Sequence, residues 1–151
     1  MESADKRREA SRKSFEIEGR LRAAGLKVTA QRRAVWSAFA SGDEGHLTAE
    51  EVFERARGEL PELARATVYN ALSELVRAGL LQVVEVRGAL VYDANLDPEH
   101  HHFRCRSCSR LYDVHLEGAE SLRISGGEGF VVDRKSIMLG GLCPECSPEE
   151  R

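Results

Sequence analysis

Apolar positions in the first half of the chain recur three or four residues apart, the spacing of helices that bury one face. The segments with this pattern are Glu16–Ala24, Ala30–Ser41, Thr48–Gly58 and Ala64–Ala78. Thr29 is placed to cap the second segment, and Thr48 with Glu51 forms the capping-box pattern that begins the third. Gly42-Asp43 and Gly79 end the second and fourth segments. The pattern therefore predicts four short helices.

The next segment has the composition of a β-hairpin. Leu81–Val86 and Ala89–Asp93 are rich in β-branched residues, and Arg87-Gly88 forms a turn between them. Short helices followed by such a hairpin are the parts of a winged helix-turn-helix, whose recognition helix enters a DNA groove. The polar face of the fourth helix carries groups that contact phosphates and base edges, namely Arg65, Thr67, Tyr69, Asn70 and Ser73. A polar helix face is also what a solvated surface looks like, so the order of elements carries this prediction.

The second half of the chain differs in character. Residues 94–98 (Ala-Asn-Leu-Asp-Pro) form a short connector that we interpret as a hinge. Beyond it, strands are expected at Glu99–Arg104, Arg110–Leu116, Phe130–Asp133 and Ser136–Leu139, with a helical stretch at Glu117–Ile124. A small unit of this kind has exposed sheet edges, which favours pairing with a second copy.

These elements predict an α+β protein of two domains. Residues 1–93 form a winged-helix DNA-binding domain, 94–98 the hinge, and 99–151 a small α/β dimerisation and zinc-binding domain. A length of 151 residues excludes a large multi-domain enzyme, and 42% hydrophobic with 31% charged residues is a globular composition. The sequence contains neither a long apolar run nor a secretory signal, so a cytoplasmic protein is expected.

The net charge of −3 conceals a basic N-terminal region. Residues 1–35 carry ten Lys or Arg against five Asp or Glu. This excess allows a local anion-binding face on a mildly acidic protein, and the phosphate backbone of DNA is one candidate anion. A solvated helix surface explains the same charges, so the charge alone leaves both interpretations open.

Four cysteines form two pairs, Cys105-x-x-Cys108 and Cys143-x-x-Cys146. In a reducing compartment two such pairs are typical of a four-thiolate Zn²⁺ site, because a two-residue gap lets both sulfurs of a pair reach one ion. The long gap between the pairs exceeds zinc-ribbon spacing, so other structure must lie between them. Redox dithiols or disulfides are the alternatives, although a redox motif would need only one pair.

Three consecutive histidines precede the first cysteine pair. On a strand His100 and His102 point to one face and His101 to the other. If the chain reverses midway between Cys105 and Cys108, position 100 pairs with Asp113, which would share the face of His100 and His102. Two imidazoles and a carboxylate suit Fe²⁺, Mn²⁺, Zn²⁺ or Ni²⁺.

Two residues of the first domain extend this candidate site. Asp93 at the hinge and His46 before the third helix are placed to complete it. A solvated interpretation remains for any lone histidine and is the one we prefer for His115. The same ligand set would also serve a small non-haem iron or zinc enzyme, but the sequence shows no phosphate loop or nucleophile motif in support. We therefore do not expect an enzyme.

Taken together, these residues resemble the ferric uptake regulator family of metal-dependent repressors. The resemblance is carried by Gly25–Arg32, His46–Glu50, Ala66–Tyr69, Tyr92-Asp93, His100–Cys108 and Gly141–Cys146. It implies a homodimer on a palindromic double-stranded DNA operator, with structural Zn²⁺ on the four cysteines. It also implies a regulatory Fe²⁺ or Mn²⁺ near the hinge, on His46, Asp93, His100, His102 and Asp113.

Within that family, aspartate at position 113 resembles the peroxide-sensing branch, because iron sensors more often have glutamate there. In that branch Fe²⁺ reacts with hydrogen peroxide, a histidine ligand is oxidised and repression is lifted, so His46 and His100 are the expected oxidised ligands. The alternative within the family is a repressor of iron or other metal uptake. For DNA, Tyr69 and Arg65 are expected at base edges or nearby backbone. The other expected DNA contacts are Thr67, Asn70, Gln31, Arg32 and Arg87, with the last three on phosphates.

Overall fold

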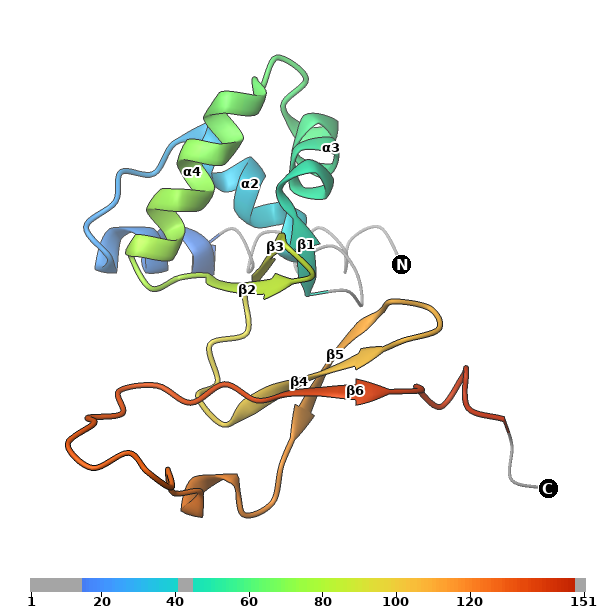
Figure 1. Cartoon of the computed structure of the whole chain (residues 1–151). Helices are drawn as coiled ribbons and strands as arrows, with labels where there is room; N and C mark the ends of the chain where they lie inside the picture. Colours follow the sequence, from blue (N-terminus) through green and yellow to red (C-terminus); the bar gives the residue numbers. More distant parts are fainter. Residues whose placement is uncertain (1–14, 41–44, 149–151) are drawn as a thin grey trace, which may run out of the picture. The chain divides into compact units, whose positions relative to one another are not determined.

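The computed structural model describes residues 15–40 and 45–148 and divides the chain into two compact units, Met1–Leu96 and Asp97–Arg151 (Figure 1). No helix of the described residues is long and apolar enough to cross a bilayer. The end of the second predicted helix at Ser41 and its stop signal Gly42-Asp43 lie outside the described residues.

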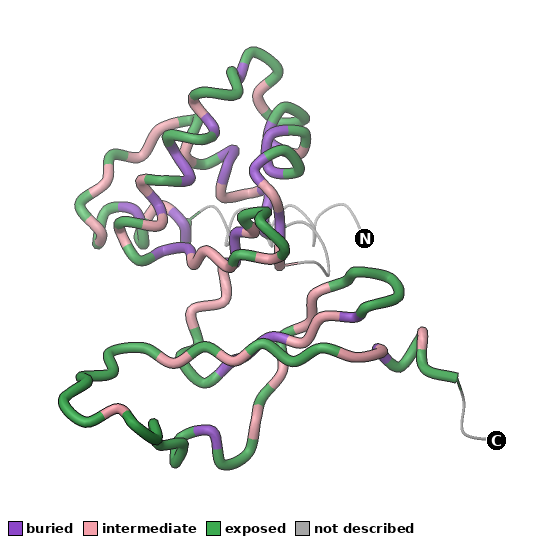
Figure 2. Tube along the Cα trace, viewed as in Figure 1, coloured by how far each residue is buried: buried purple, intermediate pink, exposed green. Residues whose placement is uncertain are grey.

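The first unit is a set of helices followed by a small sheet. A helical segment covers residues 15–23. The elements after it are α2 (Ala30–Ala40), β1 (His46–Thr48), α3 (Ala49–Glu59), α4 (Arg65–Arg77), β2 (Gln82–Val86) and β3 (Ala89–Asp93). The core takes side chains from each helix, and fully buried examples are Leu21, Val35, Val52, Val68 and Leu72 (Figure 2). Burial of these side chains is the main source of stability in this unit.

The helix starts follow the local chemistry predicted from the sequence. Thr29 Oγ accepts a hydrogen bond from the Arg32 backbone N–H at 3.2 Å, which caps α2. Thr48 and Glu51 form a complete capping box at α3. Arg87 and Gly88 both have positive φ, 51° and 80°, as a tight turn between β2 and β3 requires. These capping and turn predictions are confirmed.

The sequence pattern did not predict β1. This three-residue strand pairs antiparallel with β3, giving the sheet order β1-β3-β2, and its register places His46 opposite Asp93. Leu47, the middle residue of β1, is fully buried. Three residues are too few to show alternation, so only the distant partner strand identifies them. The resulting helices and three-stranded wing form the predicted winged helix-turn-helix.

The second unit contains a three-stranded sheet and few helical residues. Its elements are β4 (His100–Cys105), β5 (Leu111–His115), the 3₁₀ turn η1 (Ala119–Ser121) and β6 (Met138–Gly141). The strand order is β5-β4-β6, with β4 antiparallel to β5 and parallel to β6. The unit is therefore a small sheet with the two cysteine-containing segments at the ends of β4 and β6.

Three predictions for the second unit need correction. The helix expected at Glu117–Ile124 is only the short η1 turn, and the strand expected at Ser136–Leu139 begins at Met138 instead. No strand forms at Phe130–Asp133 within the described chain, where the exposed fractions of Phe130 and Val131 are 73% and 86%. An apolar run predicts a buried strand only when the same chain supplies a partner for it, and this run has none here.

The register between β4 and β5 also differs from expectation. His100 pairs with His115, and His102 pairs with Asp113. The turn is centred one residue later than predicted, because Ser109 belongs to it with a left-handed φ of 62° and its N–H donates to the Cys105 carbonyl. The pairing is displaced by two residues, an even number, so the predicted faces are preserved.

Candidate metal centres and DNA-contacting surface

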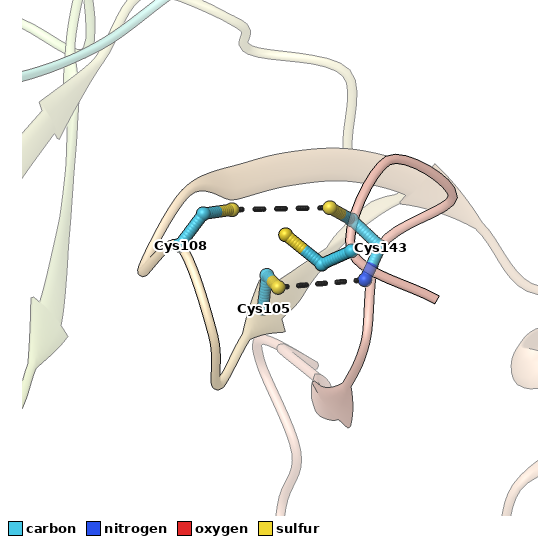
Figure 3. Close-up of side chains that lie close together, drawn as sticks. Cys105, Cys108 and Cys143 are labelled. Carbon is cyan, nitrogen blue, oxygen red and sulfur yellow. Dashed lines mark hydrogen bonds between the residues drawn. The ribbon is translucent and has the colours of Figure 1, made fainter. Parts of the chain in front are cut away.

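The four cysteines come together at one end of the second sheet. Cys105 ends β4 and Cys108 follows it in the turn, while Cys143 and Cys146 follow β6. All four are free thiols, and their sulfurs lie within 4.8 Å of one another. The Sγ atoms of Cys108 and Cys143 are 3.8 Å apart, and the labelled sulfurs converge in Figure 3. Tetrahedral zinc with Zn–S bonds of about 2.3 Å requires sulfur separations of about 3.8 Å, so this cluster fits the ion.

Neighbouring polar groups stabilise the charged thiolate form of Cys105 and Cys143. Backbone N–H groups, that of Cys108 foremost and that of Cys143 next, lower the pKa of Cys105 to about 6. The neighbouring Tyr112 hydroxyl is the largest cause of the lowered pKa of Cys143. Thiolates are the species that bind zinc, so these groups favour the binding form.

A second group of candidate ligands lies on β4 and β5 of the second unit. His100 Nε2 is 4.0 Å and His102 Nε2 is 3.6 Å from Asp113 Oδ1, so the three side chains share a face. Both histidines are buried. His100 Nδ1 donates to the Asp97 carbonyl, which can only accept, and this places the lone pair of a neutral ring on Nε2. His100 therefore presents a ligand atom toward Asp113.

The first unit contributes its own imidazole and carboxylate. The pairing of β1 with β3 sets His46 Nε2 at 3.3 Å from Asp93 Oδ2. Asp93 is fully buried, and its other oxygen, Oδ1, accepts the Asn95 backbone N–H at 2.8 Å. This second bond holds the carboxylate so that Oδ2 faces His46. The two predicted residues of the first unit therefore lie together.

The remaining histidines are His101, on the opposite face of β4, and His115, on β5 directly opposite His100. His101 points to the opposite face of β4 from His100 and His102, is 1% exposed, and accepts the Ile137 backbone N–H on Nδ1 at 3.3 Å. His115 is exposed and pairs with His100 across the sheet. Neither joins the His100, His102 and Asp113 group.

The predicted DNA contacts on α4 and the wing are accessible. Arg65, Tyr69 and Asn70 on α4 are exposed, as is Arg87 at the β2–β3 turn, and Thr67 is half-buried. Gln31 on α2 is also exposed. The Arg65 guanidinium pairs with Glu50 and lies 4.5 Å from the centre of the Phe53 ring. These contacts hold Arg65 at the first turn of α4.

Arg32 has partners inside the first unit. Its Nε and Nη2 donate to Glu74 Oε2 at 3.0 and 2.7 Å, and its Nη1 donates to the Lys27 carbonyl at 2.7 Å. The Arg32 side chain is only 17% exposed. The phosphate contact expected for Arg32 stays a prediction, and it would require the guanidinium to leave these partners.

Comparison with known proteins assigns this arrangement to a class. The model of the Ferric uptake regulator family matches residues 23–138. Transcriptional regulator FurA of Mycobacterium tuberculosis is 36% identical over 130 residues, which covers 84% of this chain and 87% of that protein. The Peroxide operon regulator of Bacillus subtilis is 27% identical, with 86% and 90% covered. The crystal structure of the Vibrio cholerae ferric uptake regulator is 25% identical, with a TM-score of 0.68 and 83% and 98% covered.

The fold and the sites thus define a winged-helix transcriptional regulator rather than an enzyme. The chain belongs to the ferric uptake regulator family and is a metal-dependent transcriptional regulator.

Proposed function

We propose that this chain is a homodimeric repressor that binds a palindromic DNA operator in the cytoplasm when iron or another divalent metal is available. The observations that carry the proposal are the imidazole and carboxylate that each unit brings together, His46 with Asp93 and His102 with Asp113, and the exposed polar face of the winged helix. Identity is higher to FurA, at 36%, than to the Peroxide operon regulator, at 27%. This difference favours metal regulation over the peroxide-sensing interpretation.

The structural ion in this proposal is Zn²⁺ on Cys105, Cys108, Cys143 and Cys146. The sulfur separations and the hydrogen bonds to the thiols support it. Zinc bound there would tie the turn after β4 to the segment after β6 and so stabilise a unit with little hydrophobic core.

The regulatory ion would be Fe²⁺ or Mn²⁺ on His46, Asp93, His100, His102 and Asp113. Each unit positions part of this set, but neither set alone satisfies a tetrahedral or octahedral ion. We propose that one ion takes ligands from both units and thereby restricts the angle between them. Such an ion shifts the equilibrium only by the difference in its affinity for the two arrangements, and a few kcal/mol is sufficient.

The second unit supplies the surface through which two copies would pair. Seven of its exposed residues are large and apolar, namely Leu122, Ile124, Phe130, Val131, Val132, Met138 and Leu139. A set of this size on a small unit is typical of an interaction surface. A dimer would give the two recognition helices a fixed separation, which a palindromic operator requires.

For DNA, we propose that Tyr69, Arg65, Thr67 and Asn70 on α4 contact base edges and the adjacent backbone. Gln31 and Arg87 would contact phosphates. The support is the exposure of these side chains and the position of α4 in the winged helix. Arg32 would join the phosphate contacts only by exchanging Glu74 for DNA.

Peroxide sensing is the second candidate function. It is favoured by the aspartate at position 113 beside two buried histidines, and by similarity to the Peroxide operon regulator. Oxidation of His46 or His100 by peroxide at bound Fe²⁺ would add about 16 Da, the mass of one oxygen. Mass spectrometry of the Fe²⁺-loaded protein after peroxide therefore separates the two candidates.

The proposal is tested by DNA binding of zinc-loaded protein at fixed salt, with and without Mn²⁺. We expect Mn²⁺ to tighten binding to an operator-like palindrome at least tenfold, equivalent to about 1.4 kcal/mol. His100→Ala should abolish this gain, whereas the matched control His115→Ala should retain it. Equal binding of the wild type with and without Mn²⁺ would contradict the proposal.

A further inference from the structure

Two arginines of the winged helix meet over one aromatic ring. Arg57 lies in the last turn of α3 and Arg65 in the first turn of α4, two helices that pack against each other (Figure 1). The guanidinium carbon of Arg57 is 5.3 Å from the centre of the Phe53 ring, and that of Arg65 is 4.5 Å from it. Both distances are those of cation–π contacts. The two guanidinium carbons are therefore at most about 10 Å apart, the sum of these distances.

The shared ring belongs to the core of the first unit. Phe53 is only 5% exposed, whereas both arginines are exposed. Arginine stems and guanidinium faces cover apolar surface while the charged edge stays in water. A guanidinium has five N–H donors, and contact with a ring face leaves most of them available. The ring thus holds two cations in place while their donors remain accessible.

The two arginines differ in their partners. Arg65 pairs with Glu50, in the first turn of α3, through its Nη1. Arg57 makes no hydrogen bond or ion pair within residues 15–40 and 45–148. Glu50 offsets one of the two positive charges, so these three side chains together carry a charge of +1. A guanidinium that is held in place without a carboxylate is suited to an anion from outside the chain.

The position of these arginines favours DNA as the source of that anion. Arg65 begins α4, and the exposed side chains of Tyr69 and Asn70 lie about one turn further along the same helix. In helix-turn-helix proteins the first helix crosses the DNA backbone, and the first residues of the second enter the groove. Arg57 is on the first of these two helices. It is therefore placed where a phosphate would lie.

We propose that Arg57 and Arg65, held by Phe53, form a binding site for the phosphate backbone of DNA. The site rests on the DNA-binding function proposed above, adds Arg57 to the contacts, and assigns Arg65 to the backbone. Phe53 is a positioning residue, because it acts through the two guanidiniums. Phosphate contacts carry no sequence information, so the site should strengthen binding to every sequence about equally.

The experiment measures binding of the zinc-loaded, full-length protein with Mn²⁺ to labelled duplexes between about 50 and 200 mM salt. Arg57→Met keeps an apolar stem over Phe53 but removes the charge. This variant should reduce the slope of log affinity against log salt by about 2 per dimer, on a palindrome and on a scrambled duplex alike. Arg57→Lys should keep the wild-type slope because the charge remains. Arg77→Met, which removes an exposed charge from the last turn of α4, is the matched control and should also keep it.

A pair of variants tests the part of Phe53. Phe53→Leu keeps an apolar side chain but removes the ring, so adding Arg57→Met to it should reduce the slope less than in the wild type. Urea unfolding checks that each variant is folded. An equal reduction in both backgrounds would exclude the role of Phe53.

The result for Arg57→Met alone decides the phosphate site. An unchanged salt slope, or a loss of affinity confined to the palindrome, would overturn the inference. Failure of the proposed function has a different signature, since the wild type would then bind the palindrome no tighter with Mn²⁺. The salt slope on the scrambled duplex would still test Arg57 in that case.

Discussion

Arg32 either joins α2 to α4 through Glu74 or contacts a DNA phosphate. The two roles predict opposite effects of an Arg32 substitution on stability and on DNA binding. The Arg32–Glu74 pair joins α2 to α4, and a third bond joins Arg32 to the Lys27 carbonyl. Charged hydrogen bonds contribute about 1.5–3 kcal/mol. Because the Glu74 side chain is 36% exposed, solvent reduces the ion pair to about 1 kcal/mol. Adding about 1 kcal/mol for the carbonyl bond, we expect Arg32→Met to lower the free energy of unfolding by roughly 2 kcal/mol.

Urea unfolding measures this loss, and salt-dependent DNA binding tests the alternative role. Each phosphate contact contributes about 0.9 to the slope of log affinity against log salt, so a dimer that uses Arg32 on DNA would lose about 2. The internal role predicts an unchanged slope. Arg33→Met, on the same helix but 47% exposed, is the stability control.

Glu74→Gln distinguishes the two roles from the other side of the pair. If the pair is structural, this variant should also destabilise the first unit, and the double variant should show a coupling of about 1 kcal/mol. If Arg32 instead serves phosphate, Glu74→Gln would free the guanidinium and tighten DNA binding. A flattened salt slope in Arg32→Met without loss of stability would refute the reasoning.

Three further predictions concern the core, the turn and the exposed apolar residues. Leu72→Ala should lower the free energy of unfolding by about 2–5 kcal/mol in urea titrations, because Leu72 is fully buried. The control Leu90→Ala, at a residue that is 51% exposed, should change it by less than about 0.5 kcal/mol, and equal losses would contradict the assigned core. Ser109→Gly should raise the free energy of unfolding of the zinc-loaded protein by about 0.5–1 kcal/mol in thermal unfolding, because φ at Ser109 is 62°, a left-handed conformation that glycine adopts without strain. Ser109→Ala should give no such gain. Val131→Asp should shift the protein toward monomer in light scattering while Leu90→Asp leaves a dimer, and an intact Val131→Asp dimer would exclude that surface.

The elements predicted correctly from the sequence carry their own local signals. The start of α3 is set by hydrogen bonds between Thr48 and Glu51, which are three residues apart in the sequence. The turn between β2 and β3 is set by the positive φ values of Arg87 and Gly88. Strand β1 has no such signal, because His46 belongs to a strand only through its pairing with Asp93. Sequence reasoning named both residues as ligands without the strand that joins them.

The errors in the second unit have the same origin. Residues 130–133 have the local pattern of a buried strand, yet Val131 is 86% exposed, and burial is decided by distant partners that the pattern does not contain. The register error arose because Ser109 adopts a left-handed conformation, which serine rarely signals.

The central claim is that one regulatory ion takes ligands from both units of each subunit and restricts the position of the DNA-binding units. Small-angle X-ray scattering of the zinc-loaded dimer, before and after addition of Mn²⁺, tests it most directly. The account predicts a narrower distribution of interatomic distances with Mn²⁺ in the wild type, and no response in His46→Ala or His100→Ala. Identical scattering with and without Mn²⁺, or a wild-type response in His46→Ala, would contradict it.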